Sequence, residues 1–377
     1  MMPGFTHRFI DVNDSYPDKF NLSRGSIRWT GEIECRESGI HKLQLYSSGY
    51  TRMWLNGELV VDAWRQNWLP WTHNFRIPME KGARYPIKIE WIPEGGFMIG
   101  MDAWWMDVTE PDIQSNLSEE ERRLRMHPTA IGSAARYLNT YSLAQARAVF
   151  EGQIKQNPDQ RVFILTRSAY AGQQRYGAAT WSGDVAARWE DLRNQVPAGL
   201  NFSMAGIPYW TTDIGGFAVE QRYINAKGED LEEWRELMTR WFQFGTFCPL
   251  LRIHGQYPYR EIYNVAPENH PAYQAMADYD NLRYRLMPYI YSLAGMVTQD
   301  GYTIMRALVM DFPDDPKVRD IGNQYMFGPA LLVSPVTEYK ARSADVYLPK
   351  SSGWYDLREG RYFEGGRKIK ADAPYSG

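Results

Sequence analysis

Ionisable side chains follow five apolar runs in the middle of the chain, and their types suit acid–base chemistry. They are Asp107, Arg167, Asp184, Asp213 and His254. Carboxylates act as nucleophiles, general acids and general bases, and arginine or histidine beside them can orient a neutral polar substrate. An aspartate after a strand can instead cap the next helix. Because five such residues follow five runs, we expect a catalytic site rather than five separate caps.

The elements that must position these residues are short strands alternating with helices. The predicted strands cover residues 101–106, 161–166, 178–183, 207–212 and 249–253. Apolar residues recur at intervals of three and four in the predicted helices, which are 134–156, 185–196, 231–244 and 273–296. Repeated β/α units predict a mostly parallel sheet or barrel. The carboxyl ends of barrel strands form the active face, so the five side chains should converge there.

The two flanking segments have all-β patterns. Residues 5–96 contain short alternating runs and the hairpin signal Asn56-Gly57, which together predict an antiparallel β-sandwich. Residues 301–377 return to short strands with Gly and Pro turns. We therefore expect a multidomain chain of α/β and all-β parts, divided at 5–96, 97–300 and 301–377.

Composition excludes several classes of protein. The chain has 42 Lys and Arg against 45 Asp and Glu in 377 residues, a net charge of −3, so a nucleic-acid partner is not expected. No apolar stretch approaches the roughly 18 residues of a membrane span. Cys35 and Cys248 lie far apart and no histidines have ligand spacing, so no metal or other cofactor is predicted. Aromatic residues make up 14% of the chain, which suits sugar binding but also a large core.

The start of the chain, Met1 to Phe5, lacks the basic and apolar regions of a secretory signal. The compartment is therefore left open, and a periplasmic or extracellular location is expected only if a leader precedes this start. The sequence indicates no particular oligomeric state.

The residues around the strand ends carry a resemblance to a known family. Residues 104–112 (WWMDVTEPD) resemble the nucleophile segment of glycoside hydrolase family 31, the α-glucosidase and α-xylosidase family. Residues 175–184 (RYGAATWSGD) resemble its acid/base segment, and residues 208–217 (PYWTTDIGGF) its next strand. Residues 127–137 (HPTAIGSAARY) are most similar to bacterial α-xylosidases that act on xyloglucan oligosaccharides.

The resemblance implies a retaining mechanism on an oligosaccharide substrate. Asp107 would attack the anomeric carbon, while Asp184 would protonate the leaving oxygen and then activate water. Glu110 and Asp112 follow Asp107 so closely that each is an alternative nucleophile, ranked below it.

The other matched positions imply substrate binding. Arg167 and His254 would hydrogen-bond the sugar, and the remaining positions near the pocket are Trp105, Trp181, Asp213 and Phe217. The structural alternatives are an ion pair for Arg167 and barrel packing for the rings. The alternative for Asp213 is that it organises its strand end without touching the reacting atoms.

Two further features follow from the resemblance. A complete barrel needs about 250 residues and eight β/α units, whereas residues 97–262 hold about five units. The family places the nucleophile on strand four and the acid/base on strand six, which implies a truncated or internally deleted member lacking strands one to three. Residues 38–64 resemble the protective-antigen-type β-sandwich module that accompanies many carbohydrate-active enzymes.

Three hypotheses remain open at this point. The first is a retaining α-xylosidase, or α-glucosidase, with activity limited by the absent strands. The second is a glycan-binding protein whose sandwich, with Trp54, Trp64, Trp68 and Trp71, acts beside an inert half-barrel. The third is a non-functional fragment of a larger gene.

Overall fold

The computed structural model divides the chain into two compact units, Met1–Asp102 and Ala103–Gly377. It describes residues 26–47, 49–64, 71–92, 103–110, 117–126, 128–350 and 352–375. The predicted start of the sandwich and the predicted boundary between residues 96 and 97 lie outside the described residues. So do Trp68, Asp112 and His127.

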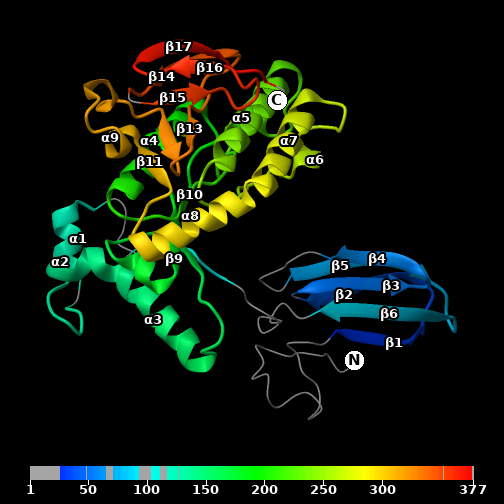
Figure 1. Ribbon diagram of the computed structural model, residues 1–377. Helices are drawn as coiled ribbons and strands as arrows, with labels where there is room; N and C mark the ends of the chain where they lie inside the picture. The colour runs from blue at the N-terminus through cyan, green and yellow to red at the C-terminus, as the bar shows by residue number, and fades with distance from the viewer. Residues whose placement is uncertain are drawn as a thin grey trace. The chain divides into compact units, whose positions relative to one another are not determined.

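The N-terminal unit contains two antiparallel sheets (Figure 1). Four strands pair in the order β1-β6-β3-β4, and β2 pairs with β5. Their bounds are β1 Ile27–Glu34, β2 Gly39–Ser47, β3 Tyr50–Leu55, β4 Glu58–Ala63, β5 Trp71–Met79 and β6 Arg84–Ile92. The predicted hairpin is confirmed, since Asn56 and Gly57 join β3 to β4 with positive φ angles of 50° and 83°. Strand β5 was not anticipated from the sequence.

Apolar side chains of the two sheets share a core. Met53, Val61 and Ala63 of the larger sheet are buried, and Leu45 and Phe75 of the smaller sheet pack against them. Burying one face of each sheet requires apolar residues at alternate positions, because successive side chains point to opposite faces of a strand.

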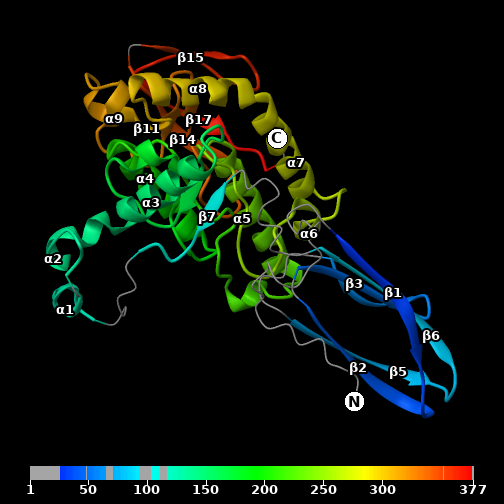
Figure 2. The ribbon, with the colours of Figure 1, turned by 90° about the horizontal axis from the view of Figure 1, so that it is seen from below.

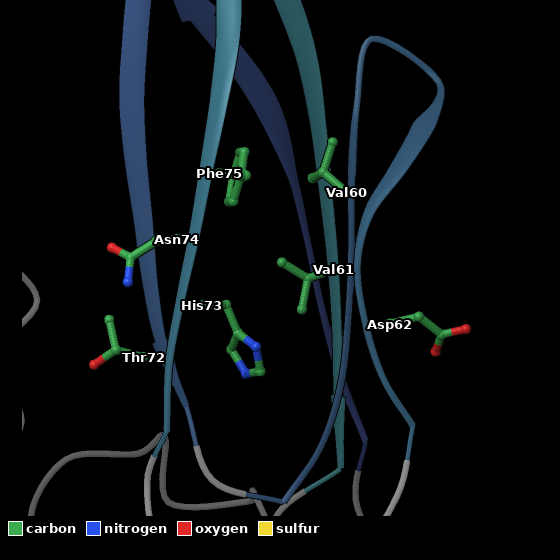
Figure 3. Close-up of a pocket in the computed structure, with 7 residues that line it drawn as sticks. All are labelled: Val60, Val61, Asp62, Thr72, His73, Asn74 and Phe75. Carbon is green, nitrogen blue, oxygen red and sulfur yellow. The ribbon is translucent and has the colours of Figure 1, made fainter. Parts of the chain in front are cut away.

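A cavity of about 450 Å³ lies beside this core. Figure 3 shows the alternation along its walls: Val61, His73 and Phe75 point between the strands, whereas Asp62, Thr72 and Asn74 point away. The lining residues are Val60, Val61, Asp62, Thr72, His73, Asn74 and Phe75. None of them is a predicted catalytic residue.

The second unit is built on a parallel sheet, as predicted. Its strands are β7 Trp104–Met106, β8 Ile164–Thr166, β9 Ala178–Trp181 and β10 Trp210–Thr211, and they pair in the order β10-β9-β8-β7. Each strand therefore neighbours the next one along the chain, which is the arrangement of successive right-handed β/α units.

The prediction of a fifth regular strand over residues 249–253 is wrong. Ile253 forms a single parallel bridge to Ile214, so the segment continues the sheet only at its end. The carbonyl oxygens before that point are bonded by side chains: Arg283 donates to Pro249, and Thr211 donates to Leu250. A proline and carbonyls already engaged in this way leave few groups for a ladder.

The predicted helices are present with shifted limits. Residues 134–156 form α2 Ala134–Tyr137, η1 Leu138–Thr140 and α3 Tyr141–Gln156, and the next two predicted helices are α4 Trp189–Met204 and α5 Gly228–Thr246. The prediction of one helix over 273–296 is wrong, because α7 Pro271–Arg285 ends before α8 Met287–Asp300. Pro288 explains the break, since its ring lacks an N–H and clashes with a carbonyl one turn earlier. The shorter helices are α1 Glu119–Arg125, η2 Gln173–Tyr176, η3 Gln221–Tyr223 and α6 Ile262–Val265.

The return to β structure after residue 301 is confirmed. Strands β11 Met305–Ala307, β12 Tyr325–Phe327 and β13 Leu331–Val333 form one sheet, and two further pairs are β14 Ser343–Leu348 with β17 Arg367–Asp372 and β15 Gly353–Tyr355 with β16 Tyr362–Glu364. The turns α9 Leu308–Asp311 and η4 Pro316–Val318 connect β11 to β12. Figures 1 and 2 show these orange and red strands gathered together at the same part of the unit as α9. Met305, Tyr325 and Phe327 are buried in one core with Leu237 and Trp241 of α5.

A buried arginine joins α5 to the last strands. Arg240 is 2% exposed and donates hydrogen bonds to the carbonyl oxygens of Ala341, Ala373 and Pro374 at 2.8–2.9 Å. Glu236, one turn earlier, lies 3.8 Å from the Arg240 guanidinium and balances its charge. A charge buried this deeply is tolerated only when it is paired and hydrogen-bonded.

We predict that Arg240→Met lowers the free energy of unfolding by about 3 kcal/mol, because buried carbonyls lose charged donors and Glu236 loses a counter-charge. Urea unfolding followed by circular dichroism measures the change. Arg193→Met is the control: Arg193 is half-exposed and pairs with Glu338 at 3.7 Å, so its loss should change stability by less than about 0.5 kcal/mol. Equal effects of the two substitutions would contradict the role given to Arg240.

Candidate active site

Arg167 lies between two of the predicted catalytic carboxylates. It follows β8, the strand between β7 and β9, so its guanidinium can reach residues after both neighbours. Its Nη1 is 3.0 Å from Asp107 Oδ1 and 3.7 Å from Asp184 Oδ2. The two carboxylate oxygens are therefore at most about 6.7 Å apart, the sum of these distances. The structure brings Asp107, Arg167 and Asp184 together, although 77 residues separate the two aspartates in sequence.

Glu110 is a third carboxylate on the same guanidinium. Arg167 Nε donates to Glu110 Oε1 at 2.8 Å, and Nη2 donates to the same oxygen. This bonding lowers the pKa of Glu110 and raises the pKa of Arg167. Glu110 thus holds the arginine through two of its nitrogens, whereas Asp107 meets the guanidinium at one nitrogen, 3.0 Å away. The geometry favours a positioning role for Glu110.

Hydroxyl groups fasten the loop after β7 to the strand beside it. Thr109 Oγ1 accepts hydrogen bonds from the Thr166 hydroxyl at 2.7 Å and from the Ser168 backbone N–H at 3.1 Å. The backbone just before Thr109 is strained, because Val108 has a φ of 50°, which is costly for a β-branched residue. The Val108 N–H donates to Asp107 Oδ1 at 2.8 Å. The loop therefore fixes the direction of the Asp107 carboxylate.

A second ion pair lies behind the first cluster. Asp213 is fully buried, and its Oδ1 is 2.6 Å from Nη1 of Arg252. Burial raises the pKa of Asp213 to about 6; the Arg252 charge opposes this shift and the Asp184 charge adds to it. No described residue hydrogen-bonds Asp213 Oδ2 or Arg252 Nη2. Buried polar atoms are usually satisfied, so these two atoms are exceptions within the described part of the chain.

Arg252 was not identified from the sequence, although a signal for it exists. It precedes His254 by two residues, and in an extended segment residues two apart point to the same face. Once His254 is placed on the active face, Arg252 follows. Its guanidinium carbon lies 5.1 Å from the ring centre of Trp181 and 5.8 Å from that of Trp105.

Aromatic rings line the site next to these charges. Trp105 is 48% exposed and stacks on Trp181, which is buried, with ring centres 5.7 Å apart. His254 lies between two rings, 5.7 Å from Trp105 and 5.6 Å from Phe217. Burial and the charges of Arg252 and Arg260 lower the pKa of His254 to about 4. His254 is therefore neutral near pH 7, and Trp181 is a packing residue behind Trp105.

Arg260 was also missed, and it fixes the loop that carries Phe217. This buried side chain donates to the carbonyl oxygens of Gly216 and Phe217 at 2.6 and 3.1 Å and to that of Pro258 at 2.7 Å. Gly216 has a φ of 73°, and a Cβ there would meet the Ala187 backbone nitrogen at 2.5 Å. Only glycine fits this close approach. The glycines of the predicted TTDIGGF strand end thus allow the loop to pack against the start of α4.

The site's charges do not suit a cation. Arg167 fills the space between the three carboxylates, and a metal there would meet a guanidinium. Within the described ranges, no three His, Cys, Asp or Glu side chains are grouped so that they could hold a metal ion. Among the described helices, none combines the length and apolar character needed to span a bilayer.

This arrangement can perform chemistry on a neutral polar substrate. Asp107 and Asp184 can act from two sides of one reacting carbon, since both lie next to the same nitrogen. Neutral His254 can hydrogen-bond hydroxyl groups, and the exposed face of Trp105 can stack on an apolar ring face.

Comparison with known proteins points to one family. The protein-family model for the glycosyl hydrolases family 31 TIM-barrel domain matches residues 44–293. The family model for the glycosyl hydrolase family 31 C-terminal domain matches residues 301–377. An alpha-xylosidase of Saccharolobus solfataricus is 47% identical over 276 residues, which cover 73% of this chain and 36% of that protein. Human neutral alpha-glucosidase C is 34% identical over 270 residues, covering 71% of this chain and 28% of that protein. The chain spans about a third of the length of these relatives.

Solved structures give the same result. A GH31 alpha-xylosidase from Xanthomonas citri matches with a TM-score of 0.71 and 33% identity, covering 96% of this chain and 61% of that one. A GH31 alpha-xylosidase from a soil metagenome, complexed with xylose, matches with a TM-score of 0.64 and 36% identity, covering 74% of this chain and 41% of that one.

We predict a pH-dependent stability difference between the protein and its Asp213→Asn variant. Because the folded protein binds the Asp213 proton more tightly than the unfolded chain, ionisation between about pH 4 and 6 costs stability, at about 1.4 kcal/mol per unit of pKa shift. The stability of the unmodified protein relative to the variant should fall over this range by about 2 to 3 kcal/mol and stay level above it.

Urea unfolding at pH 4, 5, 6 and 7 measures this difference. Asp314→Asn, at an exposed aspartate, is the control and should give a nearly constant difference. A relative stability that rises with pH would show that Arg252 outweighs burial at Asp213.

Proposed function

The chain belongs to glycoside hydrolase family 31, and from this premise we propose that it is a retaining alpha-glycosidase that acts as an alpha-xylosidase. The observation that carries the proposal is the placement of Asp107 and Asp184 beside one nitrogen of Arg167. Retaining enzymes need carboxyl groups about 5 to 5.5 Å apart, and inverting enzymes need about 6.5 to 9.5 Å. The upper limit of about 6.7 Å admits the retaining distance and excludes nearly all of the inverting range.

Asp107 acts as the nucleophile in this proposal. Its ionised carboxylate attacks the anomeric carbon, the bond from that carbon to the leaving oxygen breaks, and Asp184 gives its proton to that oxygen. Asp184 then takes a proton from water, whose oxygen attacks the same carbon and releases Asp107. Arg167 lies nearer to Asp107 than to Asp184.

The remaining site residues hold the sugar. Neutral His254 would bond its hydroxyl groups, and Trp105 would cover one ring face. Asp213 is fully buried and would act through its ion pair with Arg252. Arg167 can also reach a hydroxyl, because its Nη1 already faces the space between the two aspartates. Phe217 supports His254 rather than the sugar, because the two rings stack with an angle of 24° between their planes.

Xylose is the proposed sugar, released from xyloglucan oligosaccharides. The proposal draws on the alpha-xylosidase relative at 47% identity and on the two alpha-xylosidase structures. Glucose is the alternative, because an alpha-glucosidase is 34% identical over nearly the same share of the chain.

We also propose that the β/α region supplies five of eight barrel units, through an internal deletion or truncation. Strand β7, which carries the nucleophile, lies at one edge of the sheet, and segment 249–253 lies at the other end. A groove of about 600 Å³ borders that segment and is lined by Leu250, Leu251, Ile253 and six residues of the nearby helices, among them Phe242 and Met287. Open edges of this kind reduce stability, so activity depends on whether this unit folds cooperatively.

The protective-antigen-type assignment of the N-terminal unit is a further proposal. It is supported by the two sheets with a shared core and by the Xanthomonas structure, whose match extends over 96% of the chain. The glycan-binding alternative draws on Trp54 and Trp64 of this unit. However, Lys88 lies 3.6 Å from the ring centre of Trp54, and Arg52 lies 4.8 Å from that of Trp64. These cations already cover one face of each ring.

We predict that Asp107→Asn abolishes the release of xylose from an aryl alpha-xyloside and from an oligosaccharide, because no covalent intermediate can form. Asp184→Ala should lower kcat/KM for substrates with poor leaving groups by about 10²- to 10⁴-fold. For a dinitrophenyl alpha-xyloside, the rate of the first step should fall much less in this variant, because the leaving group needs no proton. Initial rates measured with both kinds of substrate test the two roles.

Asp159→Asn is the matched control, because Asp159 is exposed and lies before β8, at the opposite end of that strand from Arg167. Proton NMR of the first product should show alpha-xylose. A beta product would exclude retention, and turnover of only the aryl alpha-glucoside would exclude the xylosidase assignment. Cooperative unfolding without turnover of either substrate would contradict the enzyme proposal.

A further inference from the structure

Two exposed tyrosines stand on the loop that follows segment 249–253, the fifth predicted strand of the active face. Tyr257 is 50% exposed and Tyr259 is 54% exposed. Their rings pack edge to face with centres 5.6 Å apart. The loop begins directly after His254, so it leaves the sheet at the end where the ionisable cluster lies. Neither ring has a part in the chemistry described above.

This loop is held rigidly. Arg260 is buried and donates to the carbonyl oxygens of Gln256 and Pro258, on either side of Tyr257, while it also bonds Gly216 and Phe217. The Gln256 N–H donates to the Phe217 carbonyl oxygen at 2.9 Å. The loop is therefore tied to the segment whose Phe217 ring stacks on His254. The Tyr257 hydroxyl donates to Asn225 Oδ1 at 2.8 Å, which also restrains this ring.

Exposed rings on a fixed backbone suit the binding of a sugar. A tyrosine ring offers an apolar face to the C–H groups of a pyranose and a hydroxyl to its oxygens, and a ring that is already ordered loses little entropy on binding. The inner part of the site is closed by buried Asp213 and Trp181. The sugar that is cleaved off would lie among these inner groups, and the next sugar would extend outward, toward the exposed side of the face.

We propose that Tyr257 and Tyr259 form the binding site for the saccharide on the leaving-group side of the cleaved bond. The proposal rests on the proposed glycosidase function and adds a determinant of substrate length to it. The ligand class is a neutral oligosaccharide, and a small aryl leaving group would not extend to the tyrosines.

We predict that Tyr257→Ala and Tyr259→Ala each raise KM for a xylose-capped gluco-oligosaccharide about tenfold, the loss of roughly one ring contact. Their kcat values should change little. For an aryl alpha-xyloside, both KM and kcat should stay within about twofold of those of the unmodified enzyme, because binding at a remote subsite is not used. Tyr259→Phe should keep most of the oligosaccharide affinity, because it retains the ring.

The control is a second exposed tyrosine pair. Tyr355 and Tyr362 are 72% and 53% exposed, with ring centres 5.2 Å apart, on β15 and β16. Tyr355→Ala should leave all kinetic constants unchanged. Equal effects of Tyr257→Ala and Tyr355→Ala, or equal losses on the aryl and oligosaccharide substrates, would overturn the proposal.

Calorimetric binding of the same oligosaccharide to the Asp107→Asn variant supplies a readout that needs no turnover. Adding Tyr257→Ala or Tyr259→Ala to that variant should weaken binding about tenfold, whereas adding Tyr355→Ala should not. Unchanged binding in these double variants, or no binding to the Asp107→Asn variant itself, would overturn the proposed subsite. Failure of the glycosidase proposal would appear separately, as absence of turnover of the aryl alpha-xyloside.

Discussion

One guanidinium shared by three carboxylates is the interaction on which the candidate site depends. Arg167 follows the middle one of three adjacent parallel strands, so it reaches Asp107 on one side and Asp184 on the other. Two aspartates this close would repel each other without a positive charge between them. Glu110 binds the other nitrogens of Arg167 and keeps the guanidinium in place. The catalytic pair is thus a property of three strand ends together.

Buried arginines hold the irregular backbone around this site. Arg260 bonds the carbonyls of two active-face loops, Arg283 bonds those of Thr246, Cys248 and Pro249, and Arg240 bonds those of Ala373 and Pro374, just after β17. Carbonyls in loops have no ladder or helix to satisfy them, and leaving them unbonded inside the protein is costly. A planar guanidinium with five donors can satisfy several at once. The same chemistry that forms the ion pair of Asp213 therefore also builds the loops that carry Phe217 and His254.

The sequence reasoning succeeded where the pattern was local or repeated. Four strands, their order and their parallel direction follow from β/α alternation, and the hairpin at Asn56-Gly57 follows from turn chemistry. It failed where a distant contact replaced a local pattern. Segment 249–253 has the composition of a strand, but Arg283 and Thr211 bond its carbonyls. Helix 273–296 was predicted through Pro288, whose breaking effect outweighed the apolar periodicity.

The amino-acid sequence by itself determined which residue types stand at the strand ends, because β/α alternation places the carboxyl ends of all the parallel strands on one face. It thereby identified Asp107, Arg167, Asp184, Asp213 and His254 as neighbours. Only the tertiary structure decided how these neighbours are paired: Glu110 with Arg167, Asp213 with Arg252, and Trp181 behind Trp105. Such pairings depend on distances between side chains whose positions are set by packing across the whole sheet, and a difference of a few ångströms separates an ion pair from no interaction. No local pattern of residues encodes distances of that kind.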